Sequence, residues 1–264
     1  MLQTNTLGNL LAVDIGNTNI TCGIYSPTEL LWTARLASDT RRTADEYYSL
    51  LAPLLKDAGL QSLEAVALAS VVPELTRIWE HLLSKYSSAE VYEITALSDL
   101  GLTYKVDEPA RVGADLVANA FAAWKKYASH CIVIDLGTAT TVQLVSAGGC
   151  YEGVVIAPGL RTGAEQLFEK AALLTPIEIC APEVLLGNNT RNAMLSGIVH
   201  GHAFMLENMI QKLKRQYFDY KDILTVATGG IADLVKPIVP SIDVLDKTLT
   251  LDGIWLAHGH LTAR

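Results

Sequence analysis

The 264-residue sequence predicts an α/β protein made of two similar halves. Segments with strand and helix patterns alternate along the chain, an order that favours sheets covered by helices. The pattern VDIGNTN at 13–19 returns in design as IDLGTAT at 134–140. Half of the residues are hydrophobic, which is enough for a large core. We place the two halves at 1–117 and 118–264.

The first half should open with a β-hairpin. Residues 10–25, LLAVDIGNTNITCGIY, hold two apolar runs around an Asp/Gly/Asn turn cluster. Residues 43–59 predict an amphipathic helix, because a capping threonine precedes apolar positions at helical spacing and a glycine follows them. Further along, the patterns predict a strand at 65–73, a helix at 77–86, a strand at 91–95 and a helix at 113–128.

The second half repeats this order. Residues 131–149 have the pattern of the opening hairpin, and 190–217 have a long helical periodicity. Residues 222–240 predict a strand, a Thr-Gly-Gly turn and a helix, and 251–261 predict a closing helix.

Composition excludes several classes of protein. The formal net charge is −8 and no run of Lys or Arg could follow a nucleic-acid backbone, so we expect no nucleic-acid partner. The four cysteines are widely spaced, which is typical of reduced thiols and argues against structural zinc. With no signal-peptide pattern and no apolar stretch of bilayer length, we expect no membrane association and a cytoplasmic location.

The repeated hairpins have the chemistry of phosphate-binding turns. Gly lets the backbone approach a phosphate, turn N–H groups donate to it, and Thr or Asn side chains add donors. Asp14 and Asp135 cannot bind phosphate directly, but each could hold a cation that neutralises it. One such turn is also ordinary hairpin chemistry; two copies half a chain apart favour a phosphate site.

A third glycine-rich turn, Thr228-Gly229-Gly230, is predicted between a strand and a helix. Its N–H groups could meet a nucleotide, or it could be a simple helix entry.

In order and spacing, seven segments resemble the type III pantothenate kinases, which belong to the superfamily of actin and the sugar and acetate kinases. These segments are DIGNTN at 14–19, SVVP at 70–73, EPARVGAD at 108–115, DLGTATT at 135–141, PGL at 158–160, GNNTRNAMLSGI at 187–198 and ATGG at 227–230.

The resemblance implies duplicated ribonuclease-H-like halves of the actin-like ATPase fold, with mixed β-sheets flanked by helices and a nucleotide in the cleft between the halves. It implies ATP-dependent phosphorylation of the primary hydroxyl of pantothenate to 4'-phosphopantothenate, the first step of coenzyme A biosynthesis. Mg²⁺ and a monovalent cation, K⁺ or NH₄⁺, would accompany ATP. Members of the family are usually homodimers.

The same resemblance implies a role for individual residues. Asp115 would be the general base and Asp135 the ligand of the monovalent cation. The implied ATP-binding residues are Asp14, Ile15, Gly16, Asn17, Thr18, Asn19, Ile20, Thr21 and Thr138. The implied substrate positions are Val106, Gly113, Ala114, Asp115, Leu116 and Thr190. Without the resemblance, Asp115 would be explained as an acid at a helix start, and Thr190 as a helix N-cap.

Two of these positions depart from the family pattern. Leu116 stands where the family commonly has an arginine, a natural partner for the pantothenate carboxylate, and Val106 stands where it often has a tyrosine. Tyr104 should lie on the same strand face as Val106. Arg111 and Arg161 are candidates to replace the lost charge, although each also fits a solvated surface arginine.

A third departure is Glu152-Gly153, where many relatives have paired glycines, so we expect a differently shaped loop before Pro158.

Other functions stay open on these residues. A kinase of the same fold could act on another hydroxy acid, or a non-catalytic homologue could bind a nucleotide and regulate a partner. A phosphatase or ATPase of this fold is a further alternative.

Overall fold

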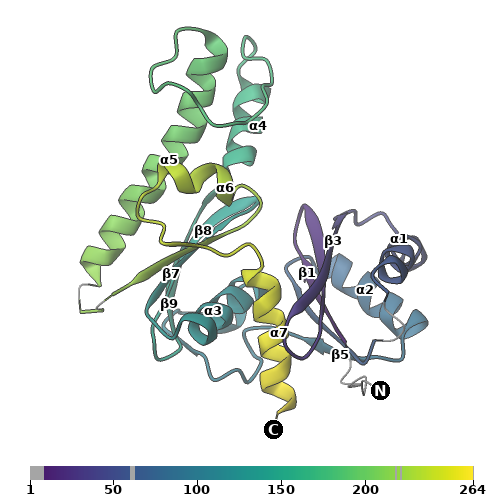
Figure 1. Ribbon diagram of the computed structural model, residues 1–264. Coiled ribbons are helices and arrows are strands. Elements are labelled where there is room, and N and C mark those ends of the chain that lie inside the picture. The colour runs from purple at the N-terminus through teal and green to yellow at the C-terminus, as the bar shows by residue number, and fades with distance from the viewer. Residues whose placement is uncertain (1–8, 60–62, 218, 221, 264) are drawn as a thin grey trace, which may run out of the picture. The chain divides into compact units, whose positions relative to one another are not determined.

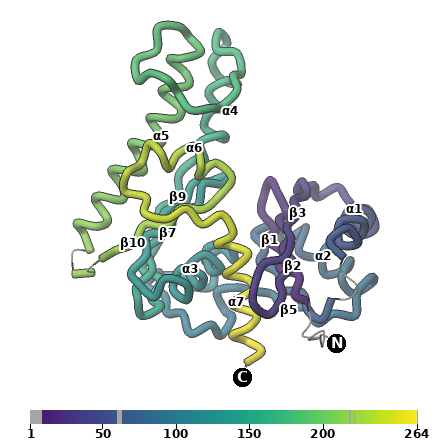
Figure 2. The backbone as a smooth tube through the Cα atoms, viewed as in Figure 1, coloured from purple at the N-terminus to yellow at the C-terminus, as the bar shows by residue number. Residues whose placement is uncertain are grey.

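The computed structural model describes residues 9–59, 63–217, 219–220 and 222–263, and the chain divides into two compact units. The first unit holds the described residues of 1–102, 107–122 and 249–264, and the second those of 103–106 and 123–248. Figures 1 and 2 show the path of the chain through each unit. The predicted halves, divided after residue 117, stay a prediction.

The first unit contains a five-stranded mixed sheet in the order β3-β2-β1-β4-β5. Its strands are β1 (Leu10–Ile15), β2 (Asn19–Tyr25), β3 (Leu30–Ala37), β4 (Ala65–Ser70) and β5 (Glu90–Glu93). The first three pair antiparallel, whereas β4 and β5 extend the sheet in parallel from β1.

Helices cover both faces of this sheet. Helices α1 (Ala44–Asp57) and α2 (Pro73–Tyr86) bury Tyr47 and Trp79 against one face of β1, the face that carries Leu11, Val13 and Ile15. Helix α7 (Leu249–Thr262) packs against β1 and β4 on the other side (Figure 1). The start of α3 (Ala114–Tyr127) packs against α7, because Gly253 leaves no Cβ in the way of the Ala118 carbonyl.

The second unit repeats this topology. Its sheet has the order β11-β10-β7-β8-β9-β6, formed by β6 (Thr103–Tyr104), β7 (Cys131–Leu136), β8 (Ala139–Val145), β9 (Cys150–Pro158), β10 (Leu224–Thr228) and β11 (Val244–Leu245). Strands β7 to β9 pair antiparallel, and β10 and β11 extend the sheet in parallel. Strands β7, β8, β9, β10 and β11 therefore correspond to β1, β2, β3, β4 and β5, which confirms the predicted duplicated α/β fold.

The helices of the second unit lie on the apolar face of β7 and β8. Helices α4 (Leu160–Lys170), α5 (Thr190–Gln216) and α6 (Ala232–Val235) bury leucine, valine and alanine side chains against Ile132, Ile134 and Leu144. The long rod of α5 is plain in Figure 2. Short 3-10 turns occur at Pro109–Arg111 and Lys236–Ile238. None of the described helices is long and apolar enough to cross a membrane.

Most predicted elements are present, with boundaries within a few residues, but the predicted loop before Pro158 is wrong. The residues around Gly153 belong to β9, which pairs with β8 over most of its length. Glu152 shapes the edge of this strand: its carboxylate accepts from Lys105 Nζ (2.8 Å) and from the Tyr220 hydroxyl (2.5 Å).

Candidate active site

The first Asp hairpin ends in a tight turn with an exposed tip. Asp14 lies near the end of β1, directly opposite Thr21 on β2. The N–H of Gly16 donates to the Asn19 carbonyl (3.0 Å), and Asn17 to Asn19 are exposed. The apolar residues on either side of Asp14 face α1 and α2, so the Asp14 side chain lies on the opposite face of the sheet, where α7 packs.

Ser38, the residue after β3, braces this turn. Its N–H donates to the Thr18 carbonyl (3.0 Å), and its hydroxyl donates to the Gly16 carbonyl (2.6 Å). The buried Tyr47 hydroxyl holds the chain on both sides of Ser38, since it accepts from the Asp39 N–H (2.8 Å) and lies 3.2 Å from the Ala37 carbonyl oxygen. The turn is therefore fixed by a side chain of α1.

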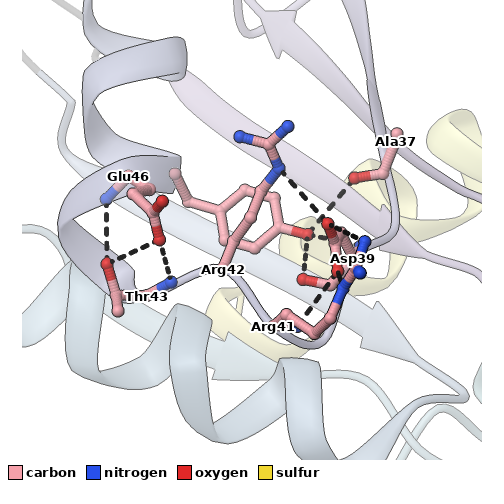
Figure 3. Close-up of polar contacts among 7 residues, drawn as sticks. Ala37, Asp39, Arg41, Arg42, Thr43 and Glu46 are labelled. Atoms are coloured by element: carbon pink, nitrogen blue, oxygen red, sulfur yellow. Dashed lines mark hydrogen bonds and ion pairs between the residues drawn. The ribbon is translucent and has the colours of Figure 1, made fainter.

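The start of α1 is fixed in turn by local contacts, which Figure 3 shows. Thr43 and Glu46 form a capping box: the Glu46 carboxylate accepts from the Thr43 N–H (2.7 Å), and the Thr43 hydroxyl accepts from the Glu46 N–H (3.3 Å). Arg41 donates from Nε to Asp39 Oδ1 (2.9 Å), and this bond lowers the pKa of Asp39. Such caps define where a helix begins.

The second Asp hairpin has the same construction. Asp135 lies near the end of β7, opposite Thr141 on β8, and the N–H of Gly137 donates to the Ala139 carbonyl (3.1 Å). The residue after the third strand again braces the turn: the N–H of Gly159 donates to the Thr138 carbonyl (3.1 Å). The Thr162 hydroxyl donates to the same carbonyl oxygen (2.7 Å).

The two turns differ in length by one residue. Ile15 pairs with Ile20 in the first hairpin, but Leu136 pairs with Thr140 in the second. The predicted overlay of 13–19 on 134–140 is therefore correct before the turn and wrong after it. Thr18 is the residue equivalent to Thr138, because the carbonyl of each accepts a backbone N–H from the residue that follows β3 or β9. The first turn therefore holds one additional residue.

Helix α5 contacts the second hairpin through His202, which lies beside Thr140 of β8. Thr140 is buried, and its Oγ1 lies 3.0 Å from Nε2 of His202 on α5. Burial lowers the pKa of His202, which favours the neutral imidazole. This contact is a consequence of tertiary packing, and the sequence pattern did not indicate it.

The glycine-rich turn after β10 packs directly against the second hairpin. Gly229 has a φ of +95°, and a Cβ there would lie 2.6 Å from the backbone of Leu136. Only glycine fits both requirements without strain. The backbone of this turn thus lies beside the strand that carries Asp135; its contact with a nucleotide stays a prediction.

Asp115 lies in the first turn of α3, in the same unit as Asp14. Its Oδ1 accepts from the N–H of Leu116 (2.7 Å). A Cβ on Gly113 would lie 2.6 Å from this oxygen and 3.5 Å from Val71, the residue after β4. The carboxyl is therefore confined beside the end of β4. Burial raises its pKa above the ordinary 3.8, although backbone N–H bonds oppose the shift.

The other predicted substrate positions fall into two sets. Gly113, Ala114 and Leu116 surround Asp115 in the first unit, whereas Val106 and Thr190 belong to the second. Leu116 is only 8% exposed, so its side chain is part of the core. An arginine at this position would need another orientation to reach a substrate.

Two local predictions about this region are wrong. Strand β6 ends at Tyr104, so Val106 lies beyond it and the two residues do not share a strand face. Thr190 is the first residue of α5 and not its cap: Asn189 caps the helix by accepting from the Asn192 N–H (2.9 Å). Thr190 Oγ1 is therefore not required for capping.

The arginines proposed as replacements lie in different units. Arg111 Nε is 2.5 Å from Glu108 Oε2, and both side chains are exposed. Arg161 is exposed at the start of α4. Lys105, directly before Val106, is a further positively charged side chain. The sequence analysis did not identify it, because its ion pair with Glu152 joins residues distant in the sequence.

The residues around Asp135 fit a binding site for a monovalent cation better than a metal site built from several carboxylates. Among the residues that the structure describes, no three His, Cys, Asp or Glu side chains form a metal-ligating group. Close to Asp135, the buried Thr141 Oγ1 has no hydrogen-bond partner in the described chain. A hydroxyl and one carboxylate are oxygen ligands of low total charge, which suit an alkali-metal ion.

Comparison with known proteins gives one family over nearly the entire chain. The family model for type III pantothenate kinase matches residues 10–212. A type III pantothenate kinase from Dehalococcoides mccartyi is 40% identical over 251 residues, covering 94% of this chain and 96% of that protein. Another, from Exiguobacterium sibiricum, is 38% identical over 251 residues, covering 94% and 98%.

Solved structures with low identity share the fold. A ROK hexokinase from Thermus thermophilus has a TM-score of 0.53 at 13% identity, covering 97% of this chain and 100% of the hexokinase. A ROK glucokinase from Streptomyces griseus, in complex with glucose and AMPPNP, has a TM-score of 0.52 at 14% identity, covering 96% and 100%. These neighbours show the actin-like fold alone.

Proposed function

The chain belongs to the type III pantothenate kinase family and is a kinase that uses ATP; we propose that it transfers the γ-phosphoryl group of ATP to the primary hydroxyl of pantothenate, the first step of coenzyme A biosynthesis. The observation that carries this proposal is Asp115, a confined carboxyl in the unit that also holds the first Asp hairpin. The product is 4'-phosphopantothenate.

In this proposal Asp115 is the general base. The hydroxyl oxygen of the substrate forms a bond to the γ-phosphorus, the bond from that phosphorus to the β–γ bridging oxygen breaks, and ADP leaves. Asp115 accepts the hydroxyl proton and holds the oxygen in line for attack. Its raised pKa supports the role, because a more basic carboxylate is a better proton acceptor at neutral pH.

The two braced turns would bind the phosphates. Exposed backbone N–H groups and the Thr and Asn side chains of Asp14–Thr21 would donate to phosphate oxygens, and Thr138 would do so from the second hairpin. Mg²⁺ accompanying ATP would neutralise phosphate charge. Asp135 would hold the monovalent cation, K⁺ or NH₄⁺, at the second turn.

An acceptor screen tests the proposal. Purified protein with ATP, MgCl₂ and KCl should convert pantothenate to a product with the mass of 4'-phosphopantothenate, and Asp115→Asn should not. Other hydroxy acids belong in the same screen, because Leu116 and Val106 depart from the family pattern. Turnover of one of them without turnover of pantothenate would reject pantothenate as the substrate and retain the kinase.

We also propose that the protein is a homodimer. Three consecutive residues of β9, Val154, Val155 and Ile156, are exposed. Strand β6 pairs with β9 only at Cys150 and Tyr151, so the outer edge of β9 beyond them has no neighbouring strand in the described chain. An apolar strand edge of this kind supports association with another copy.

A further inference from the structure

Three polar side chains share one face of the second sheet. Asp135 on β7 pairs directly with Thr141 on β8, and Val133 pairs with Gln143. Directly opposite residues of antiparallel strands share a face, and so do residues two apart along a strand. Asp135, Thr141 and Gln143 therefore point to the same side, whereas Val142 and Leu144 belong to the core on the other side.

Thr141 and Gln143 leave buried polar atoms unsatisfied. Gln143 is 0% exposed, and neither its Oε1 nor its Nε2 has a hydrogen-bond partner among the described residues. The same is true of Thr141 Oγ1. Buried polar groups are nearly always satisfied, by protein or by a bound species, and these three atoms lie on the face that carries the Asp135 carboxylate, which makes this place a candidate ligand site.

We propose that Thr141 Oγ1 and Gln143 Oε1 are further oxygen ligands of the monovalent cation that the proposed function assigns to Asp135. The inference rests on that part of the proposed function and extends it from one residue to a site built on two paired strands. Gln143 Nε2 would donate to a water molecule in the same coordination shell.

The charge and reach of the three side chains fit this ion. A hydroxyl oxygen, an amide oxygen and one carboxylate carry a single negative charge, which balances a monovalent cation and not a divalent one. Thr141 lies directly opposite Asp135, and Gln143 is one diagonal step away, within reach of its long side chain. Because all three residues are on strands, the ligands would be held rigidly.

Thermal unfolding in K⁺ provides the test. At constant ionic strength, KCl replacing choline chloride should raise the Tm of the wild-type protein. Thr141→Val and Gln143→Leu keep the shape of each side chain but remove its oxygen. We expect each variant to need at least roughly tenfold more K⁺ for the same Tm shift, as loss of one ligand interaction would cause.

Thr225→Val is the matched control. Thr225 Oγ1 is another buried hydroxyl of this sheet without a partner in the described chain, but Thr225 pairs with Ile132 and so lies on the opposite face. This variant should keep the wild-type K⁺ response. Thr141→Ser, which retains the hydroxyl, should also keep it.

Several outcomes would overturn the inference. Unchanged K⁺ midpoints in both variants would do so, as would a wild-type Tm that does not respond to K⁺. If the variants do not fold, wild-type crystals soaked in Tl⁺ decide: an anomalous peak in contact with Thr141 and Gln143 supports the site, and its absence rejects it. Phosphorylation of pantothenate by wild-type protein is measured separately, so failure here is distinguishable from failure of the proposed function.

Discussion

At Asp115, the burial that suits the carboxyl to proton transfer also opposes folding. Its pKa is raised in the folded protein, so the neutral form is favoured there relative to the unfolded chain. The resulting contribution to stability is complete below the unfolded pKa, near 3.8, and is lost as the pH rises through the higher folded value. Once the pH exceeds both pKa values, the ionised Asp115 carboxylate therefore disfavours folding.

Asp115→Asn should separate these two effects. Turnover should fall by roughly 10² to 10⁴, the usual contribution of a general base. The Tm at pH 7 should rise, because the buried charge is gone, and the difference from wild type should shrink as the pH falls towards 4. Scanning fluorimetry and a coupled ADP assay measure both. Glu80→Gln, which changes an exposed acid on α2, is the control and should alter neither. Full activity in Asp115→Asn would reject the base.

The pH dependence of turnover reports the same group. Catalysis needs the ionised carboxylate, so kcat/KM should decline on acidification in proportion to the protonated fraction of Asp115, with a midpoint above the ordinary 3.8. Unfolding measured at each pH excludes acid denaturation as the cause. A midpoint at or below the ordinary value would show that burial does not control this carboxyl.

At the scale of the element, each Asp turn is held by the residue that follows the next strand after its hairpin, β3 in the first unit and β9 in the second. Ser38 and Gly159 follow β3 and β9, and each donates its N–H to the carbonyl of Thr18 or Thr138. In the second unit the backbone of residue 159 lies so close to the turn that a Cβ on Gly159 would overlap the Gly137 and Thr138 carbonyls. The turn and the strand that braces it therefore act as one structural unit.

Gly159→Ala should displace the second turn. The added methyl group has no space against those carbonyls, and a shift of about 1 Å in a positioned group can reduce catalysis roughly 100-fold. We expect kcat/KM for ATP to fall by roughly 10- to 100-fold. Gly163→Ala on α4 is the matched control, because a Cβ there contacts nothing within 4 Å and should stabilise the helix by about 0.5–1 kcal/mol. Equal kinetics for the two variants would contradict the role of Gly159.

The sequence predicts features that depend on neighbouring residues and misses those that depend on tertiary register. Both hairpins and the main helices follow from local patterns. The alternating strand β3 and the exposed part of β9 were not predicted, and the latter lacks a clear alternation because Val154, Val155 and Ile156 are all exposed. The braces from Ser38 and Gly159 join residues about 20 apart in the chain, so no local motif indicates them.

For the molecule as a whole, duplication explains why one sheet topology occurs twice with different chemistry. Each sheet supplies an Asp turn at the end of the first strand of its hairpin, β1 or β7. Among the described residues, the first unit adds an acid at a helix start near this edge, Asp115, and the second carries Thr141 and Gln143, whose side-chain oxygens are buried. The repeated scaffold thus supports a division in which one unit supplies the proposed base and the other the proposed cation site.

Association with another copy would use a surface of the second unit alone. If the edges of β9 pair about a two-fold axis, Ile156, 65% exposed, should lie near the same residue of the other copy. Ile156→Lys would place like charges there, which costs several kcal/mol and should weaken the dimer roughly 100-fold or more. Sedimentation velocity over a concentration series measures this. Leu97→Lys changes an exposed leucine of the first unit, 79% exposed, and should leave the dimer intact. A monomeric wild type, or an unaffected Ile156→Lys dimer, would place β9 outside any interface.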